Sequence, residues 1–308
     1  MTELRHPKAD NVKLAVITII FTVFALSLGD ALIKGLSLSF PLWQLFVLRS
    51  LIAIPALIIF IRLRAKSTSL MPKAWFWITV RSLLLSLMWV AYYVALPFID
   101  LAVAGAVYYT LPLFITLLAW LFVGEKVSPI AWLAIGVGFL GVIVILRPSG
   151  EDFNWAALLP LISALFYAIA MLLTRTKCHD ESPLILGLSL HVSLVGLGLL
   201  GTFLLPLVFP EAQELTGNAF LFGDWTTMNS TSWLAMWGLA LAAVLGSVLG
   251  AFAYQTGPSA TVATFDYCYL AFIALWGIIF FAEIPDVWTL VGMALIAVAG
   301  ILAIRKTS

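Results

Sequence analysis

The stretch YYTLPLFITLLAWLFVGEKV (residues 108–127) recurs in altered form as DYCYLAFIALWGIIFFAEIP (residues 266–285). The alignment places Tyr109 opposite Tyr267 and Glu125 opposite Glu283. Each repeat unit contains five apolar segments, and an odd number of membrane crossings forces the second copy to insert upside down relative to the first. Inverted repeats with a binding site between them are typical of secondary transporters.

The composition around these stretches is that of a membrane protein. Of 308 residues, 63% are hydrophobic and 10% are charged, and the mean hydropathy is +1.11. A soluble domain has about 45–50% apolar and about 25% charged residues, so a water-soluble enzyme is excluded. Because a spanning helix takes about 20 residues, we predict an all-α integral membrane protein with ten transmembrane helices. The predicted spans are residues 13–33, 41–61, 74–95, 100–122, 129–146, 154–174, 182–207, 232–254, 259–281 and 287–304.

The basic residues indicate how the chain is oriented. If the N-terminus is cytoplasmic, the predicted outer segments carry only Lys34 and Arg147, and positive residues are expected to gather on the inner side. The inner segments then hold Arg5, Lys8, Lys13, Arg62, Arg64, Lys66, Lys73, Lys126, Arg175, Lys177, Arg305 and Lys306. We therefore predict cytoplasmic N- and C-termini, an outer loop over 210–231, and a multi-pass protein of the cell inner membrane. The first repeat covers 1–148 and the second 149–308.

Ionisable and aromatic residues within the spans are the candidate site. A charge at membrane depth costs roughly 2.5–3.5 kcal/mol on insertion scales and is normally paired or lines a wet cavity. Tyrosines cluster in the third, fourth and ninth spans and can form pocket walls. Structural pairing of the charges and ordinary packing of the tyrosines remain the alternatives. The candidate substrate-binding residues are Arg49, Arg81, Tyr92, Tyr109, Asp266, Tyr267 and Tyr269.

Three more ionisable residues are candidates for gating or coupling: Asp30, Lys34 and His191. Asp30 and Lys34 stand one turn apart on one helix face, so an intrahelical pair is the alternative to a gate. His191 falls opposite Arg49 when the two repeats are aligned, and it is expected to be a hydrogen-bonded neutral histidine or a proton relay.

Glu125 and Glu283 end apolar spans before short turns. We expect both to have a structural role, capping the following helix or bonding backbone in the turn.

Other motifs argue against catalysis and cofactors. Two matches to GxGxxG, at Gly136–Gly141 and Gly196–Gly201, lie inside apolar spans and not after a strand, so they indicate close helix packing rather than nucleotide binding. Cys178 and Cys268 have no metal-ligand spacing. We expect no cofactor and no metal. A net charge of +1 gives no basic stripe for nucleic acid.

These residues resemble the drug/metabolite transporter superfamily, in its EamA-type branch of ten-helix proteins. Within that branch the chain is similar to the group that includes S-adenosylmethionine uptake and riboflavin transporters. The resemblance is carried by Asp30-Ala-Leu-Ile-Lys34, Arg49, Val-Arg81-Ser-Leu-Leu, Leu111-Pro112-Leu-Phe, Gly124-Glu125-Lys, Gly138-Phe-Leu-Gly141-Val, Leu146-Arg147-Pro148 and Ala282-Glu283-Ile-Pro285-Asp286.

Together these features predict a secondary transporter that moves a small polar or zwitterionic metabolite by alternating access. Arg49 and Arg81 would orient an anionic group, and Asp266 would attract a cationic group or carry a coupled proton. The alternatives are an exporter of amino acids, amines or drug-like compounds, and a membrane-embedded binding or structural protein without transport. The expected partners are a small-molecule substrate and the lipid bilayer, with a proton as candidate coupling ion, for a monomer or homodimer.

Overall fold

The computed structural model describes residues 11–64, 69–124, 128–147, 154–178, 180–209, 219–256, 262 and 265–305, and every regular element among them is a helix. The elements of the first half are α1 (Val12–Leu36), α2 (Leu42–Arg64), α3 (Trp75–Ala95), α4 (Leu101–Tyr108), α5 (Leu111–Leu118), η1 (Ala119–Val123) and α6 (Pro129–Leu146). Those of the second half are η2 (Trp155–Leu158), α7 (Leu159–Lys177), α8 (Pro183–Val208), α9 (Ala219–Phe222), α10 (Ser230–Thr256), α12 (Cys268–Phe281) and α13 (Val287–Arg305).

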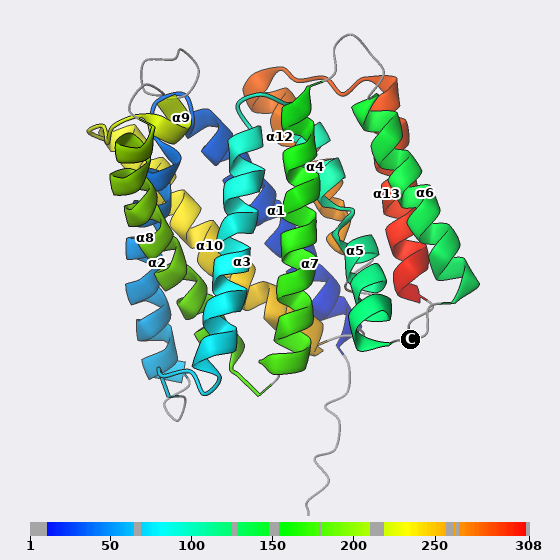
Figure 1. Ribbon diagram of the computed structural model, residues 1–308, viewed down its shortest axis with the longest axis horizontal. Helices are drawn as coiled ribbons and strands as arrows, with labels where there is room; N and C mark the ends of the chain where they lie inside the picture. Colours follow the sequence, from blue (N-terminus) through cyan, green and yellow to red (C-terminus); the bar gives the residue numbers. More distant parts are fainter. Residues whose placement is uncertain are drawn as a thin grey trace, which may run out of the picture.

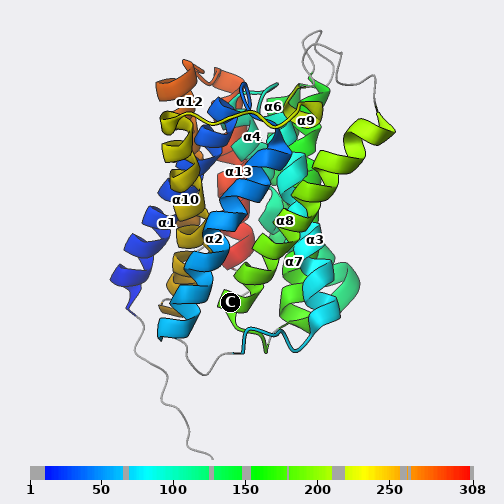
Figure 2. The same cartoon turned by 90° about the vertical axis from the view of Figure 1, so that its left-hand side faces the viewer.

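Within the described residues, seven helices are long and apolar enough to cross a membrane. Three shorter apolar helices accompany them, over Trp132–Leu146, Cys268–Phe281 and Val287–Leu302. The helices stand side by side with their axes running between the same two ends of the molecule (Figure 1). We call the end at which α1 begins and α13 ends the terminal end, which is the lower end of both Figures 1 and 2. The other end, which carries α9, is called the distal end.

One predicted span is not a continuous helix. The segment expected over 100–122 breaks at Tyr109 and Thr110, between α4 and α5, and finishes as the π-helix η1. Pro112 stands in the first turn of α5, where its missing N–H and its ring prevent α4 from continuing through. The Tyr109 N–H still bonds the Gly105 carbonyl at 2.9 Å, whereas the Thr110 N–H bonds the Val107 carbonyl, three residues back, at 3.3 Å. The segment therefore changes from one helix to another at Thr110.

Four helix pairs make the most extensive contacts: α6 with α13, α2 with α8, α1 with α10, and α3 with α7. The first two pairs stand at opposite sides of Figure 1, and the α3–α7 pair lies in front. Small residues allow these approaches. A Cβ on Gly292 would lie 2.7 Å from the backbone oxygen of Gly141, and a Cβ on Gly198 would lie 3.1 Å from the backbone oxygen of Trp43. The glycine motifs therefore serve close helix packing, as the sequence indicates.

The two copies of the repeated stretch share backbone features at aligned positions. Gly124 and Ala282 both adopt the left-handed conformation, with φ +74° and +56°. Tyr109 and Tyr267 both interrupt a helix, with φ −72° and −61° and ψ near zero. A left-handed residue ends the helix in each copy, although alanine, unlike glycine, bears a steric cost there.

Candidate functional site

A cavity of about 790 Å³ lies among the helices of both halves. Its lining extends from the level of Asp30 and Tyr93 to Pro183, the first residue of α8 at the terminal end. The lining contains all seven candidate substrate-binding residues, together with Asp30 and His191. These nine side chains come from α1, α2, α3, α8, α12 and the segments beside the two helix breaks.

Arg49 is a buried cation held by aromatic rings. It is 3% exposed, and its guanidinium carbon lies 5.5, 5.9 and 5.8 Å from the ring centroids of Phe46, Trp89 and Tyr93. Its Nη1 donates to the Tyr93 hydroxyl at 3.2 Å, whereas its Nε has no hydrogen-bond partner among the described residues. No carboxylate of the described chain lies within ion-pair distance of Arg49. The cation is stabilised by π-faces and keeps hydrogen-bonding capacity for an anion.

Asp30 is bonded across the two halves of the chain. The Tyr269 hydroxyl on α12 donates to Asp30 Oδ2 on α1, and the same hydroxyl lies 3.0 Å from the Tyr92 hydroxyl on α3. Asp30 is 4% exposed. This chain of three oxygens connects three helices at one level of the cavity.

The third cluster surrounds the helix breaks. Tyr109 stacks on Tyr269 with ring centroids 4.8 Å apart and meets Tyr267 edge-on at 5.4 Å. Its hydroxyl lies 3.4 Å from the backbone oxygen of Asp266. The Asp266 carboxylate receives no hydrogen bond and forms no ion pair within the described residues. The buried Tyr267 hydroxyl likewise has no partner there.

Arg81 and His191 lie on other walls of the cavity. Arg81 is 8% exposed, and its Nε donates to Thr174 Oγ1 at 2.6 Å. Twelve residues of α3 separate Arg81 from Tyr93, a rise of about 18 Å along the helix, so Arg81 lies well below Arg49 toward the terminal end. His191 Nδ1 lies 3.2 Å from Ser50 Oγ. The structure thus brings Arg49, Asp30 and the tyrosines to one region and leaves Arg81 apart from them.

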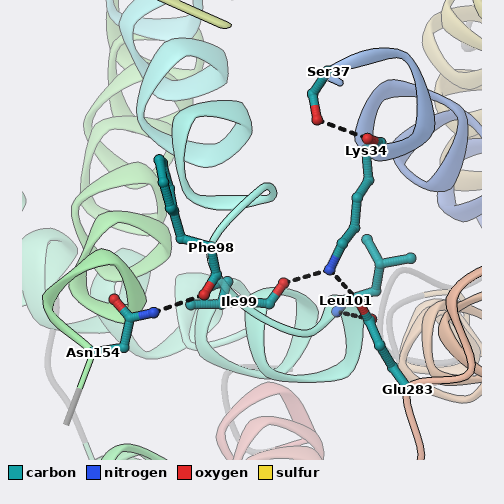
Figure 3. A network of polar contacts seen from close by, with 7 residues as sticks. All are labelled: Lys34, Ser37, Phe98, Ile99, Leu101, Asn154 and Glu283. Carbon is teal, nitrogen blue, oxygen red and sulfur yellow. Dashed lines mark hydrogen bonds and ion pairs between the residues drawn. The ribbon is translucent and has the colours of Figure 1, made fainter. Parts of the chain in front are cut away.

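Lys34 and Glu283 pair with each other at the distal end and do not line the cavity (Figure 3). Lys34 Nζ also donates to the Ile99 carbonyl at 2.6 Å, and Glu283 Oε2 accepts the backbone N–H of Leu101 at 2.8 Å. Lys34 therefore does not pair with Asp30. We call the Lys34, Glu283, Ile99 and Leu101 contacts the distal latch.

The sequence predicts that Glu283 caps the following helix or bonds backbone in its turn, whereas its carboxylate bonds the backbone N–H of Leu101. Glu283 caps the start of α4 from the loop that follows α12, because its carboxylate accepts the first free N–H of α4. Asp286 caps the following helix, α13, accepting the Thr289 N–H at 2.8 Å. Hydrogen bonds from the side chain and the backbone N–H of Thr289 hold the pKa of Asp286 below its usual value. Glu125 lies outside the described residues.

Sequence reasoning missed several aromatic residues of the lining. Trp89 precedes Tyr92 and Tyr93 by one turn of α3, a helical spacing that places it on their face of the helix. Tyr167 is the single tyrosine of its predicted span, and it meets Tyr108 edge-on at 6.1 Å. The helical spacing of Trp89 from the two tyrosines could have predicted its place in the lining. For Tyr167 the available signal was that it is the only tyrosine in its predicted span. No three His, Cys, Asp or Glu side chains among the described residues gather as a metal site.

A bundle of apolar helices around a cavity lined by charged and aromatic residues is the arrangement of a multi-pass membrane protein. Comparison with known proteins points to one family for the first half of the chain. Residues 13–147 match the model of the EamA-like transporter family. This match includes the first copy of the repeated stretch.

Several curated proteins resemble the chain over much of its length. A pseudopaline exporter of Pseudomonas aeruginosa is 27% identical over 96% of this chain and 98% of its own length. A riboflavin transporter of Rhizobium johnstonii is 33% identical over 71% of this chain and 65% of its own. An S-adenosylmethionine uptake transporter of Rickettsia felis is 25% identical over 65% and 62%. One crystal structure shares the fold at 18% identity, with a TM-score of 0.62 over 96% of each chain.

Proposed function

We propose that this protein is a secondary transporter that moves a small polar or zwitterionic metabolite across the inner membrane by alternating access. In this proposal the helices form ten transmembrane spans, built as two inverted five-helix repeats over 1–148 and 149–308, with both termini in the cytoplasm. In this proposal the three shorter apolar helices also cross the membrane, in addition to the seven long ones.

The pattern of helix contacts supports the inverted repeat. In the proposed correspondence α1 matches α7 and α3 matches α10, so the α1–α10 and α3–α7 pairs are the same contact made twice. The α2–α8 and α6–α13 pairs each join a helix to its own counterpart. The left-handed residues Gly124 and Ala282 and the breaks at Tyr109 and Tyr267 repeat in the same way.

The observation that carries the transport proposal is the set of charges inside one aromatic cavity. Arg49 and Asp266 both line it, and neither forms an ion pair within the described residues. Arg49 is buried and Asp266 is half-buried. Charges without partners at membrane depth are costly, so a zwitterionic solute that supplies both missing partners is stabilised there. Arg49 would hold the anionic group, Asp266 the cationic group, and the tyrosines would form the walls.

The two ends of the bundle support alternating access. The cavity lining reaches the terminal end, whereas at the distal end the latch joins α1, the start of α4 and the end of α12. This arrangement is what a state open to the cytoplasm requires. We propose that Lys34 acts in gating by exchanging its partners when the distal end opens, and that Asp30 and His191 act in coupling the movement to ligand or proton.

The test begins with a ligand. Purified protein is screened by thermal shift against amino acids, amines, flavins and nucleosides, and any stabilising compound is then followed into liposomes that contain the protein. We expect Arg49→Ala, Arg81→Ala and Asp266→Asn to lower uptake at least tenfold at equal protein content. Arg147→Ala, which removes an exposed arginine paired with Asp286, is the matched control and should transport normally. Normal rates in all three cavity variants would remove these residues from the mechanism.

Export is the second candidate, favoured by the similarity to the pseudopaline exporter over nearly the whole of both chains. Right-side-out and everted vesicles distinguish the two directions under the same ion gradients. Saturable binding with no flux in either orientation would instead indicate a binding protein without transport.

A further inference from the structure

Arg81 stands at the part of the cavity nearest the terminal end, apart from the central cluster of Arg49, Asp30 and the tyrosines. Its two partners mark this level: Thr174 lies three residues before the end of α7, and Leu186 lies three residues after the start of α8. Both of those helix ends lie at the terminal end. Arg49 bonds Tyr93, which lies twelve residues further along α3 than Arg81, so the two arginines stand at different levels of the cavity.

Two of the three nitrogens of the Arg81 guanidinium have acceptors among the described residues, and the third has none. Nε donates to Thr174 Oγ1 at 2.6 Å, and Nη1 points to the Leu186 carbonyl at 3.4 Å. Thr174 donates its own proton to the Ala170 carbonyl at 2.8 Å, so a lone pair of its oxygen faces Arg81. The described residues offer Nη2 no hydrogen-bond partner and bring no carboxylate within ion-pair distance. The nearest titratable neighbours are Tyr167 and Cys178.

This geometry matches an anion site better than a structural support. A guanidinium that is nine-tenths buried and has no counterion is unfavourable unless an anion visits it. Its planar fork is oriented by two fixed acceptors, and arginine binds carboxylate or phosphate through such an oriented edge. Arg81 lines the same cavity as Arg49, so an anion held there is on the path to the central cluster.

We propose that Arg81 forms a separate anion-binding station at the terminal-end mouth of the cavity. The anionic group of a solute docks there before it reaches Arg49, or after it leaves. This inference rests on the proposed transport path, but its test needs no transported substrate. The anion station can therefore be disproved while transport stands. It can also be confirmed while the proposed substrate class is wrong.

The test measures the local charge with a reporter cysteine. Cys178 and Cys268 are replaced by alanine, and Met171, which lines the cavity one turn from Thr174, is replaced by cysteine. The reporter reacts with two methanethiosulfonate reagents, one bearing a sulfonate and the other a trimethylammonium group. We expect Arg81→Gln to lower the ratio of anionic to cationic reaction rates by about fivefold or more, from the loss of one nearby charge. Arg81→Lys should retain most of the ratio.

Arg49→Gln in the same background is the matched control, because it removes an equal charge from the level of Tyr93. Its effect on the ratio should be less than twofold. A ratio unchanged within twofold by Arg81→Gln, or an equal change with Arg49→Gln, would overturn the inference.

A second measurement uses the protein with Arg81 intact, in case Arg81→Gln does not fold. Inorganic phosphate, compared with chloride at equal ionic strength, should slow the sulfonate reagent at Met171→Cys at least threefold. It should leave the trimethylammonium reagent unchanged or faster. Equal rates in phosphate and chloride would show that no anion is held at this level.

Discussion

At the scale of the residue, the site is a set of charges whose partners are aromatic. Arg49 rests among Phe46, Trp89 and Tyr93, and Asp30 is held by the Tyr269 hydroxyl. Rings and hydroxyls stabilise these ions without neutralising them. A solute can therefore compete for Arg49 without first breaking a salt bridge, which a permanent Arg–Asp pair would demand.

Tyr269→Phe tests the bond across the two halves. The change removes the hydroxyl that bonds Asp30 and Tyr92 while keeping the ring that stacks on Tyr109. We expect the free energy of unfolding in detergent to fall by about 1.5–3 kcal/mol, the range for a hydrogen bond to a charged group. Tyr108→Phe is the control, since no described residue bonds the Tyr108 hydroxyl. Equal stability of the Tyr269→Phe and wild-type proteins would contradict the bond.

At the scale of the element, repeated backbone features determine where helices stop. The two copies of the quoted stretch end in a left-handed residue, glycine in one and alanine in the other. In each copy a tyrosine interrupts the helix beside the cavity. Breaks of this kind put backbone carbonyls and side chains at membrane depth where they line a cavity.

Exchanging the two left-handed residues should shift stability in opposite directions. Ala282→Gly is expected to gain about 0.5–1 kcal/mol, since relief of a left-handed penalty of roughly 1–2 kcal/mol outweighs the extra freedom of glycine in the unfolded chain. Gly124→Ala, where no atom blocks a Cβ, should lose a similar amount for its φ of +74° alone. Thermal unfolding in detergent measures both, and a shift of the same sign in the two variants would refute the shared conformation.

The α6–α13 contact gives a second test at this scale. Gly292→Ala would bring a Cβ to 2.7 Å from the backbone oxygen of Gly141, so the helices must separate. We expect a loss of about 1–3 kcal/mol, as for other overpacked sites. Gly136→Ala, on α6 with open space at its Cβ, is the control and should be close to neutral. A thermal melt that ranks Gly136→Ala as the more damaging change would show that the helices do not meet here.

At the scale of the whole molecule, the cavity lining reaches the terminal end of the bundle and the latch lies at the distal end. Lys34 and Glu283 come from opposite halves of the chain, and their pair also holds the backbone of Ile99 and Leu101. Opening the distal end must therefore separate one half from the other. The Lys34 side chain is 12% exposed and the Glu283 side chain 14% exposed. In the proposed mechanism, their ion pair stabilises the closed distal end.

Glu283→Gln should make the cavity more accessible from the distal side. A single cysteine at Leu26, which lines the cavity, is labelled in oriented vesicles with a membrane-impermeant maleimide. We expect the Leu26→Cys protein with Glu283 intact to be labelled mainly from the terminal side. Adding Glu283→Gln should raise labelling from the distal side at least threefold. Asp286 lies three residues after Glu283 and pairs with Arg147 at the surface. Asp286→Asn is therefore the control, and its labelling should match that of the protein with Glu283 intact. Unchanged distal labelling in Glu283→Gln would argue against a gate at the latch.

Much of this architecture could be predicted from the sequence, because hydropathy acts on each segment separately. A run of apolar residues partitions into the bilayer whatever its neighbours are, so the positions of the helices follow from composition and from breakers such as Pro112. The depth of Arg49, Arg81 and Asp266 follows in the same way from their places within the runs. Tyr109 and Tyr267 could be paired because the repeat aligns them.

The partners of those residues were decided only by the tertiary structure. Asp30 and Lys34 share a helix face, yet Asp30 bonds Tyr269 and Lys34 bonds Glu283, each more than two hundred residues away. Arg49 and Arg81 have the same chemistry, yet Arg49 bonds Tyr93 on α3 and Arg81 bonds Thr174 on α7, at different levels of the cavity. Which side chains meet depends on how each helix is rotated and how far it slides along its neighbours. Those quantities arise from packing all the helices at once, and no single segment encodes them.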